Sequence, residues 1–134
     1  MRRRARARAL QALYAWDVLG RRDLIVDAER LWSDLAVGAD ERAFATPLVK
    51  AVATRRAEVD ALLGEVTTNW RMERVGAVER ALLRLGVAEL LLGTTPVRVT
   101  IQEAVRLGER FGTDESARFV NGVLDAVARR LGRI

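Results

Sequence analysis

The sequence contains neither cysteine nor histidine. Without cysteine there can be no disulfide, thiolate metal site or thiol nucleophile. Without histidine the chain also lacks the commonest metal ligand and the side chain that titrates nearest neutral pH. Together the two absences exclude zinc fingers, Ser-His-Asp triads and Cys-His dyads. A chain without cysteine is compatible with a reducing compartment, and we expect a cytoplasmic protein.

Long apolar runs are absent as well. No stretch approaches the roughly 18 residues that a membrane-spanning helix needs. Residues 2–8 and 9–16 form a charged and then an apolar region, as in a signal peptide. Gln11 and Asp17 interrupt the apolar part, however, and no clear small-residue cleavage site follows. We therefore predict no membrane span and no removable targeting segment.

Proline occurs only twice, at Pro47 and Pro96, and no segment alternates between apolar and polar residues as a half-buried strand does. Apolar residues instead recur at helical spacing in nearly every segment. A chain of 134 residues is the size of one domain and can bury about two-thirds of its unfolded surface. We predict a single all-α domain over residues 1–134 with six or seven helices.

Breaks and capping residues set the limits of the expected helices. The third helix can begin in two ways: at Pro47 with Thr46 as its N-cap, or at an earlier turn over residues 41–45 that is followed by a kink. The expected helices span about 3–19, 24–35, 47–66, 75–92, 100–111 and 114–131. The candidate caps are Gly20, the capping box of Thr100 and Glu103, and either Thr113 or Asp114, and the second helix follows Asp23.

The formal net charge of +5 is unevenly placed. Residues 1–16 hold five arginines and no acid, so the rest of the chain, with 18 basic and 18 acidic side chains, sums to zero. Lys50 is the single lysine. Every other cation is an arginine, which can form a bidentate fork with phosphate or stack on a ring. We call the five N-terminal arginines the basic arm: Arg2, Arg3, Arg4, Arg6 and Arg8.

On a helix, Arg4, Arg8 and Gln11 line one flank of the basic arm, and Arg2 and Arg6 line a neighbouring flank. Like charges so close together repel one another, which favours an anionic partner. A nucleic-acid backbone supplies dense negative charge and releases counterions on contact. A solvated, frayed terminus explains the same charges. A membrane-surface helix is disfavoured because the apolar side carries core-like leucine and tryptophan.

Two aromatic residues stand close to these polar flanks. Tyr14 lies one helical turn beyond Leu10 and can share a surface with Gln11. Phe119 is offset by about 100° from the core stripe of the last helix, and Asn121 by the same angle to the other side. A ring outside the core can stack on an unpaired base. From spacing alone, packing against the edge of a neighbouring helix is the simpler explanation for Phe119.

The segment 75–92 is apolar on almost every side, which predicts a central helix surrounded by others. Arg84 and Glu89 within it need partners if they are buried, so we expect internal salt bridges. Acid/base catalysis by paired carboxylates is disfavoured, because neither metal-ligand spacing nor a glycine-rich phosphate loop accompanies them. We predict no catalytic residue, no metal site and no cofactor.

An ordered set of short motifs resembles the NusB family of bacterial transcription antitermination factors. The resemblance covers almost the whole chain, although residues 23–63 match only in their helical pattern, and the last motif is the most specific. The motifs are Arg2-Arg3-Arg4-Ala5-Arg6, Ala9-Leu10-Gln11-Ala12-Leu13-Tyr14-Ala15-Trp16, Asn69-Trp70, Arg74, Val78-Glu79-Arg80-Ala81-Leu82-Leu83-Arg84-Leu85, Glu89-Leu90, Pro96, Val99, Ile101, Glu103-Ala104-Val105, Phe111-Gly112 and Phe119-Val120-Asn121-Gly122-Val123-Leu124.

The resemblance implies an all-α fold of two small helical bundles. It also implies a heterodimer with NusE, a small-subunit ribosomal protein, that binds boxA RNA and helps RNA polymerase pass terminators, notably in ribosomal RNA operons. The RNA-facing residues would be Arg2, Arg3, Arg4, Arg6, Arg8, Gln11, Tyr14, Arg118, Phe119 and Asn121. The partner-facing residues would be Arg74, Glu79, Ile101 and Glu103. Ala88 and Gln102 depart from the family pattern near that partner face.

Two further hypotheses stay open. The same helical module precedes the catalytic domain of ribosomal RNA cytosine methyltransferases. This chain would match those enzymes only as a fragment, because it ends at Ile134 without a Rossmann-like domain or a cysteine. A helical protein–protein adaptor would instead leave the basic arm solvated. Relatives of this type exist as monomers and as homodimers, and the sequence does not choose between these states.

Overall fold

The structure is a computed structural model that describes residues 1–67 and 75–134. In this part of the chain there are seven α-helices and no strand, which confirms the predicted all-α class. None of these helices is long and apolar enough to cross a membrane. The helices are α1 (Arg2–Val18), α2 (Leu24–Asp34), α3 (Ala39–Thr54), α4 (Arg56–Val66), α5 (Ala77–Leu92), α6 (Val97–Phe111) and α7 (Asp114–Arg130).

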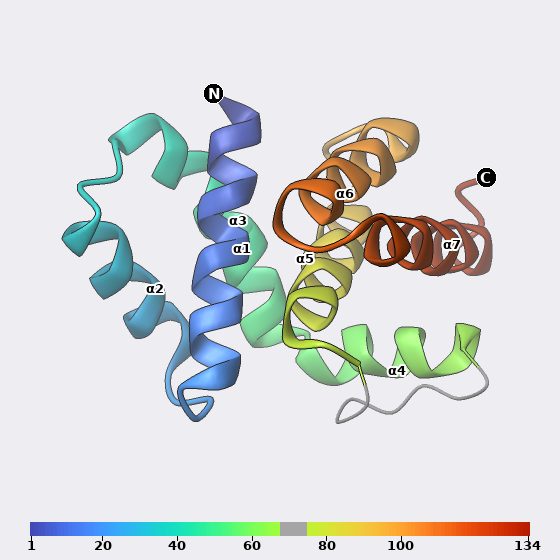
Figure 1. Cartoon of the computed structure of the whole chain (residues 1–134), viewed down its shortest axis with the longest axis horizontal. Coiled ribbons are helices and arrows are strands. Elements are labelled where there is room, and N and C mark those ends of the chain that lie inside the picture. Colours follow the sequence, from blue (N-terminus) through green and yellow to red (C-terminus); the bar gives the residue numbers. More distant parts are fainter. Residues whose placement is uncertain (68–74) are drawn as a thin grey trace.

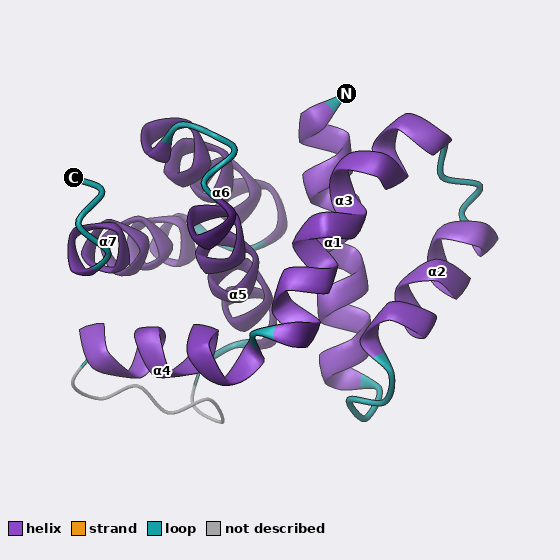
Figure 2. Cartoon of the chain, turned by 180° about the vertical axis from the view of Figure 1, so that it is seen from behind, coloured by secondary structure: helices purple, strands orange, loops and turns teal. Residues whose placement is uncertain are grey.

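The helices form two packed groups (Figure 1). On one side lie α1, α2 and α3, and on the other lie α5, α6 and α7, with α1 in contact with both α3 and α5. The remaining helix, α4, lies beneath α5 and α7 when the molecule is seen from the front and from behind (Figure 2). This arrangement agrees with the two small bundles that the resemblance implied.

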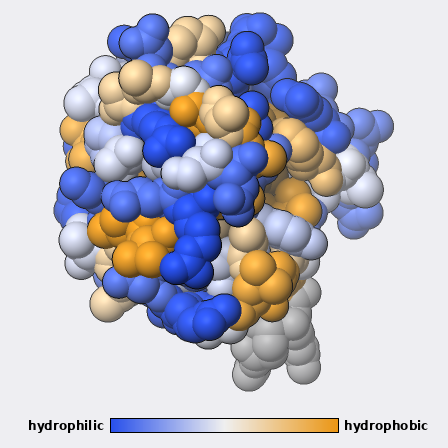
Figure 3. Space-filling view, turned by 90° about the vertical axis from the view of Figure 1, so that its left-hand side faces the viewer, coloured by the Kyte–Doolittle hydropathy of each residue, from blue (hydrophilic) through white to orange (hydrophobic). Residues whose placement is uncertain are grey.

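The centre of the core is α5, as predicted for the segment that is apolar on almost every side. Leu82, Leu83, Val87 and Leu90 are each at most 1% exposed, because α1, α3, α4, α6 and α7 all pack against this helix. The surface on the α2 side is different, since hydrophilic side chains there separate small hydrophobic patches (Figure 3).

Several predicted helix ends are confirmed. Asp23 caps α2 by accepting a hydrogen bond from the Val26 N–H at 3.1 Å, and the Thr113 hydroxyl caps α7 by accepting one from the Ser116 N–H at 3.1 Å. Each bond satisfies a backbone donor that a helix start leaves without a partner. Gly20 follows α1 with φ at +113°, a conformation that residues with a side chain rarely adopt.

The predicted third helix is wrong in length, and the earlier of its two considered starts is correct. The structure has two helices here, α3 from Ala39 and α4 from Arg56, separated at Arg55. Pro47 lies inside α3, where it removes one backbone hydrogen bond. The helix continues because apolar side chains on both sides of the proline are buried in the core. Tertiary packing therefore outweighs the local signal of the proline.

The predicted capping box of Thr100 and Glu103 is also wrong. The helix α6 begins three residues before Thr100, at Val97, with Pro96 at its N-cap. The fixed φ of proline is compatible with entry into a helix. The Thr100 hydroxyl is buried inside α6 without a hydrogen-bond partner among the described residues, and Glu103 reaches across to arginines of α1.

Arg84 and Glu89 form internal salt bridges, as predicted, but each has partners on another helix. Glu89 pairs with Arg6 of α1, and Arg84 Nε lies 3.2 Å from Asp60 Oδ1 of α4. Ionised groups lose their hydration when they are buried, so partners of opposite charge are required. These pairs connect the central helix to α1 and to α4.

The buried carboxylate of Asp17 makes the stability of the protein depend on pH. Burial raises the pKa of Asp17, but hydrogen bonds from Arg80 and Arg21 outweigh this effect and hold the pKa below its ordinary value. The ionised group therefore stabilises the folded state above about pH 4, and this stabilisation is lost as the pH falls through the lowered pKa.

We expect Asp17→Asn to lower the free energy of unfolding at pH 7, because Arg80 and Arg21 lose their anionic partner. The difference from the wild type should begin to narrow below about pH 4, where Asp17 of the unfolded wild type binds a proton, and should narrow further as the pH falls through the lowered pKa of the folded state. Urea titrations at a series of pH values measure both curves. A difference that stays constant from pH 7 to pH 2 would contradict an ionised Asp17 in the folded protein.

Candidate nucleic-acid interface

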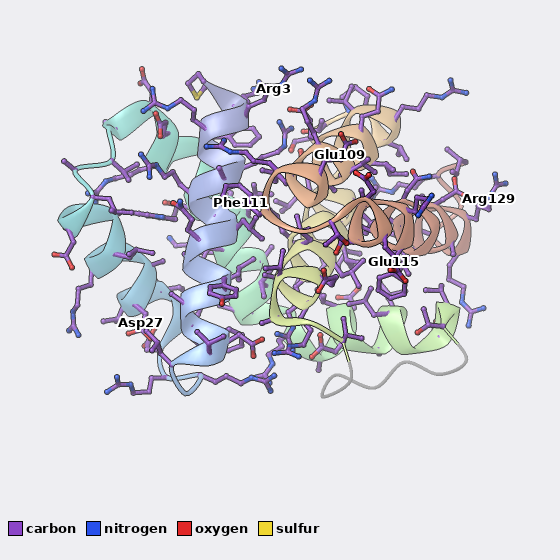
Figure 4. All side chains as sticks on the ribbon, in the orientation of Figure 1. Arg3, Asp27, Glu109, Phe111, Glu115 and Arg129 are labelled. Carbon is purple, nitrogen blue, oxygen red and sulfur yellow. The ribbon has the colours of Figure 1, made fainter. Side chains whose placement is uncertain are left out.

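The basic arm forms the first two turns of α1, and its side chains differ in exposure. Arg3 and Arg4 extend into solvent, with 64% and 72% of their side chains exposed, and Arg2 is exposed too. Figure 4 shows Arg3 at the outer end of α1, beside the N-terminus. Arg8 is mostly covered, with 22% of its side chain exposed. Three predicted RNA contacts are therefore freely accessible at the surface, and a fourth is accessible in part.

Arg6 is the member of the basic arm that faces inward. Its side chain is 5% exposed, and its Nη2 and Nε lie 2.6 Å and 2.9 Å from the two carboxylate oxygens of Glu89. Arg6 precedes Leu10 by one helical turn, so it lies on the same stripe as the core residues of α1. The structure therefore places Arg6 in a buried ion pair and not at the surface where the prediction has it face RNA.

Two carboxylates lie against the other arginines of the arm. Glu103 of α6 accepts a hydrogen bond from Arg3 Nε at 3.0 Å. Glu41 of α3 lies 3.5 Å from Arg4 Nε and 3.4 Å from Arg8 Nε. Ion pairs that are open to solvent contribute little energy and are screened by salt. The side chains of Arg3 and Arg4 are mostly exposed, so their pairs are weak and a stronger anion can replace the carboxylates.

The residues predicted to face a protein partner do not gather on one open surface. Ile101 is 9% exposed and Glu103 is 8% exposed, so neither residue is open at the surface in this structure. Because α6 begins before them, they fall inside a helix and on its inner side. Glu79 accepts a hydrogen bond from the Ser116 hydroxyl, which links the start of α5 to the start of α7. Arg74 lies outside the described residues.

An apolar pocket of about 220 Å³ opens beside Tyr14 on α1. Tyr14 is 41% exposed, so its ring is available at the surface. The walls come from α1, the first turn of α5 and the end of α6. The lining residues are Leu10, Gln11, Tyr14, Val78 and Phe111. The structure thus brings the predicted residues Gln11 and Tyr14 together with an aromatic residue that was not predicted at the site.

Phe111 is that additional residue, and helical spacing alone placed it on the inner side of its helix. It is the last residue of α6, so no further turn covers it, and it is 36% exposed. Figure 4 shows it at the end of α6, on the side toward α1. Its position just before Gly112, where the helix stops, was the available signal that this ring could reach the surface.

Arg118, Phe119 and Asn121 lie on the exposed surface of α7. Phe119 is 39% exposed, so much of its ring stays free of the neighbouring helices. Arg118 and Asn121 line a groove of about 860 Å³ between α6 and α7. The two helices approach closely there, since a Cβ added at Gly108 would lie only 3.2 Å from the Cα of Ala117.

The chemistry of this face suits a flexible, anionic partner with aromatic groups. Guanidinium groups pair with phosphates, and exposed rings stack on unpaired bases. Within residues 1–67 and 75–134, no group of three or more acidic side chains is placed to hold a metal ion.

Comparison with known proteins gives the family. The NusB family model matches residues 3–129. The transcription antitermination protein NusB of Anaeromyxobacter dehalogenans is 47% identical over 132 residues, which cover 97% of this chain and 92% of that protein. The protein of the same name from Solibacter usitatus is 45% identical over 134 residues, which cover 97% of this chain and 90% of that protein.

Solved structures have the same fold. The structure of T. maritima NusB matches with a TM-score of 0.88 and 31% identity, over 96% of this chain and 91% of that one. A crystal structure of the antitermination factors NusB and NusE in complex with double-stranded RNA matches with a TM-score of 0.86 and 30% identity, over 97% and 98% of the two chains. With sequence and fold in agreement from α1 to α7, the chain belongs to the NusB family.

Proposed function

We propose that this protein is a transcription antitermination and termination factor that binds boxA-type single-stranded RNA together with a NusE-type ribosomal protein. In this role it supports processive transcription of ribosomal RNA operons within the antitermination complex of RNA polymerase. The observation that carries the proposal is the similarity, over 97% of this chain, to a chain in the crystal structure of NusB and NusE in complex with double-stranded RNA. We propose further that it acts in the cytoplasm, as one domain and without enzymatic activity.

The basic arm supplies the affinity for the RNA backbone. Arg2, Arg3 and Arg4 are exposed at the start of α1, and each can exchange its present contact for a phosphate. Charge-assisted bonds from a guanidinium to a phosphate are shorter and stronger than neutral hydrogen bonds. Release of counterions from the RNA adds to the driving force, so binding weakens as salt rises.

The aromatic pocket supplies contacts to bases. An unpaired base can stack on Tyr14, with Phe111 on the opposite wall of the pocket. The Gln11 amide at the rim can donate to and accept from the edge of a base. Arg118, Phe119 and Asn121 offer a second set of exposed contacts on α7. This division follows the general rule that phosphate contacts give affinity and base contacts give sequence preference.

The face toward the protein partner would lie near the start of α5. Glu79 and Arg74 are our candidates for it, and Glu79 also stabilises the start of α7 through Ser116. The hydrogen bond from Ser116 to Glu79 connects the start of α5 to the start of α7. A partner that binds near the start of α5 would therefore influence the RNA contacts on α7. Light scattering of the free protein, with and without RNA, would tell whether a homodimer forms and whether it covers the RNA surface.

The test is fluorescence anisotropy with a boxA RNA, a scrambled RNA and a duplex of the boxA sequence, with and without the NusE-type partner. We expect the tightest binding to single-stranded boxA RNA when the partner is present. If Arg2, Arg3, Arg4 and Arg8 each meet a phosphate, log affinity should fall against log salt with a slope of about −3, at about 0.7 per contact. Equal affinity for boxA and scrambled RNA would contradict specific recognition.

Replacing Arg2, Arg3 and Arg4 together with alanine separates this proposal from the adaptor hypothesis. These side chains are exposed, so the fold should persist and the salt slope should drop by about two. Unchanged RNA affinity with intact binding of the NusE-type partner would favour the adaptor. As a control for folding, the circular dichroism spectrum of the variant should match that of the wild type.

A further inference from the structure

One carboxylate, Glu41, holds two arginines of the basic arm at the same time. Its Oε2 lies 3.5 Å from Arg4 Nε and its Oε1 lies 3.4 Å from Arg8 Nε. The two arginines are four residues apart and therefore share one flank of α1. Only 15% of the Glu41 side chain is exposed, so the carboxylate is fixed between them. It stands where a phosphate would have to bind.

The position of Glu41 in the fold is the start of a helix. It lies in the first turn of α3, where the partial positive charge of a helix start stabilises an anion. A cavity of about 470 Å³ opens at the same place, between the starts of α1 and α3. An incoming RNA backbone therefore has room to approach Arg4, whose side chain is 72% exposed.

We infer that Glu41 is an internal competitor of RNA phosphate that limits the affinity of the basic arm. This inference rests on the proposed RNA binding. A phosphate can displace the carboxylate from Arg4, because exposed ion pairs are weak. Glu41 stays anchored on α3 after displacement, and its charge then repels the phosphate at short range. Displacing Glu41 from Arg8 carries the same kind of free-energy cost. Glu41 therefore reduces the contribution of both arginines to the RNA affinity.

The chain offers a matched control in the neighbouring Asp40. This residue lies in the same first turn of α3, is exposed, and forms no ion pair with any described residue. Asp40→Asn and Glu41→Gln each remove one negative charge from nearly the same place. They alter the overall charge equally, so a difference between them reports on the contact with Arg4 and Arg8 rather than on net charge.

The experiment measures the RNA affinity of both variants by fluorescence anisotropy, with boxA and scrambled RNA. We expect Glu41→Gln to tighten binding about five-fold. Asp40→Asn should tighten binding less than about two-fold, because Asp40 lines the same cavity but pairs with neither Arg4 nor Arg8, so only its solvent-screened charge is removed. In a chain with Arg4→Ala and Arg8→Ala, Glu41→Gln should change affinity by less than about two-fold, since its partners are gone. Circular dichroism and thermal unfolding verify the fold, and Glu41→Ala replaces Glu41→Gln if that variant does not fold.

Several outcomes would overturn the inference. Equal gains in the two variants would assign the effect to net charge, and a loss of affinity in Glu41→Gln would make Glu41 a residue that orients the arginines for RNA. If Glu41→Gln still tightens RNA binding in the chain with Arg4→Ala and Arg8→Ala, the gain does not come from the contacts of Glu41 with these two arginines. Because Glu41 competes with phosphates, the affinity of Glu41→Gln relative to the wild type should be the same for boxA and scrambled RNA. This expectation holds even if the protein shows no preference for boxA. If neither RNA binds, the test is the salt concentration at which each variant elutes from a heparin column. Elution of Glu41→Gln and Asp40→Asn at the same salt concentration would overturn the inference.

Discussion

Replacing Arg6 with alanine is expected to lower the free energy of unfolding by about 3–5 kcal/mol. The change leaves the Glu89 carboxylate, which is 2% exposed, without its bidentate partner in the interior. An unpaired buried charge is costly because nothing replaces its lost hydration. Denaturant unfolding followed by circular dichroism measures the loss, provided that the transition is two-state.

Arg4→Ala is the matched control for this prediction. Arg4 belongs to the same arm and also pairs with a glutamate, but 72% of its side chain is exposed. Its replacement should cost at most about 1 kcal/mol. The double variant Arg6→Met with Glu89→Leu should recover most of the lost stability, because apolar pairs of similar size can replace buried ion pairs. Equal losses in Arg6→Ala and Arg4→Ala would contradict a buried role for Arg6.

Replacing Tyr14 with alanine is expected to weaken RNA binding by about 5- to 150-fold. This range corresponds to about 1–3 kcal/mol for one base stacked on an aromatic ring. The ring is 41% exposed at the mouth of the aromatic pocket, so its removal should leave the fold intact. Anisotropy with the boxA RNA at fixed salt measures the effect, and the salt slope should stay unchanged because no phosphate contact is lost.

Two variants make the result for Tyr14 specific. Tyr14→Phe retains the ring and should bind within about two-fold of the wild type. Leu19→Ala removes an exposed apolar side chain that follows α1 and should have no effect, since Leu19 is 70% exposed and outside the pocket. An equal loss in Tyr14→Phe and Tyr14→Ala would assign the contact to the hydroxyl group. Wild-type affinity in Tyr14→Ala would remove the pocket from the RNA interface.

Much of the fold could be predicted because local rules and tertiary structure agree over most of the chain. The second helix follows Asp23, as predicted, Thr113 is the cap of the last helix from the two candidates considered, and the apolar segment 75–92 forms the central helix. The predicted start of the third helix failed because the local sequence signal and the tertiary packing disagree there. Pro47 reads locally as a helix start, yet the core on both sides of it keeps α3 continuous.

The candidate site was harder to predict because its details depend on distant partners. Helical spacing placed Gln11 and Tyr14 on one surface, and the structure agrees. The partner of Arg6 is 83 residues away in sequence, and no periodicity within α1 reveals a carboxylate that arrives from another helix. The same holds for Glu41, which pairs with Arg8 across 33 residues. Charge could be counted along the chain, but its pairing required the fold.

The inward turn of Arg6 has a consequence for the cost of ligand binding. A free basic tail would lose conformational entropy each time it settled on a strand of RNA. Here one arginine of the series anchors the helix to Glu89, so the outer arginines project from a surface that is already ordered. Such preorganisation reduces the entropy that binding must offset. Arg6 is not available to a phosphate, but its pair with Glu89 holds the helix that carries the outer arginines in place before RNA binds.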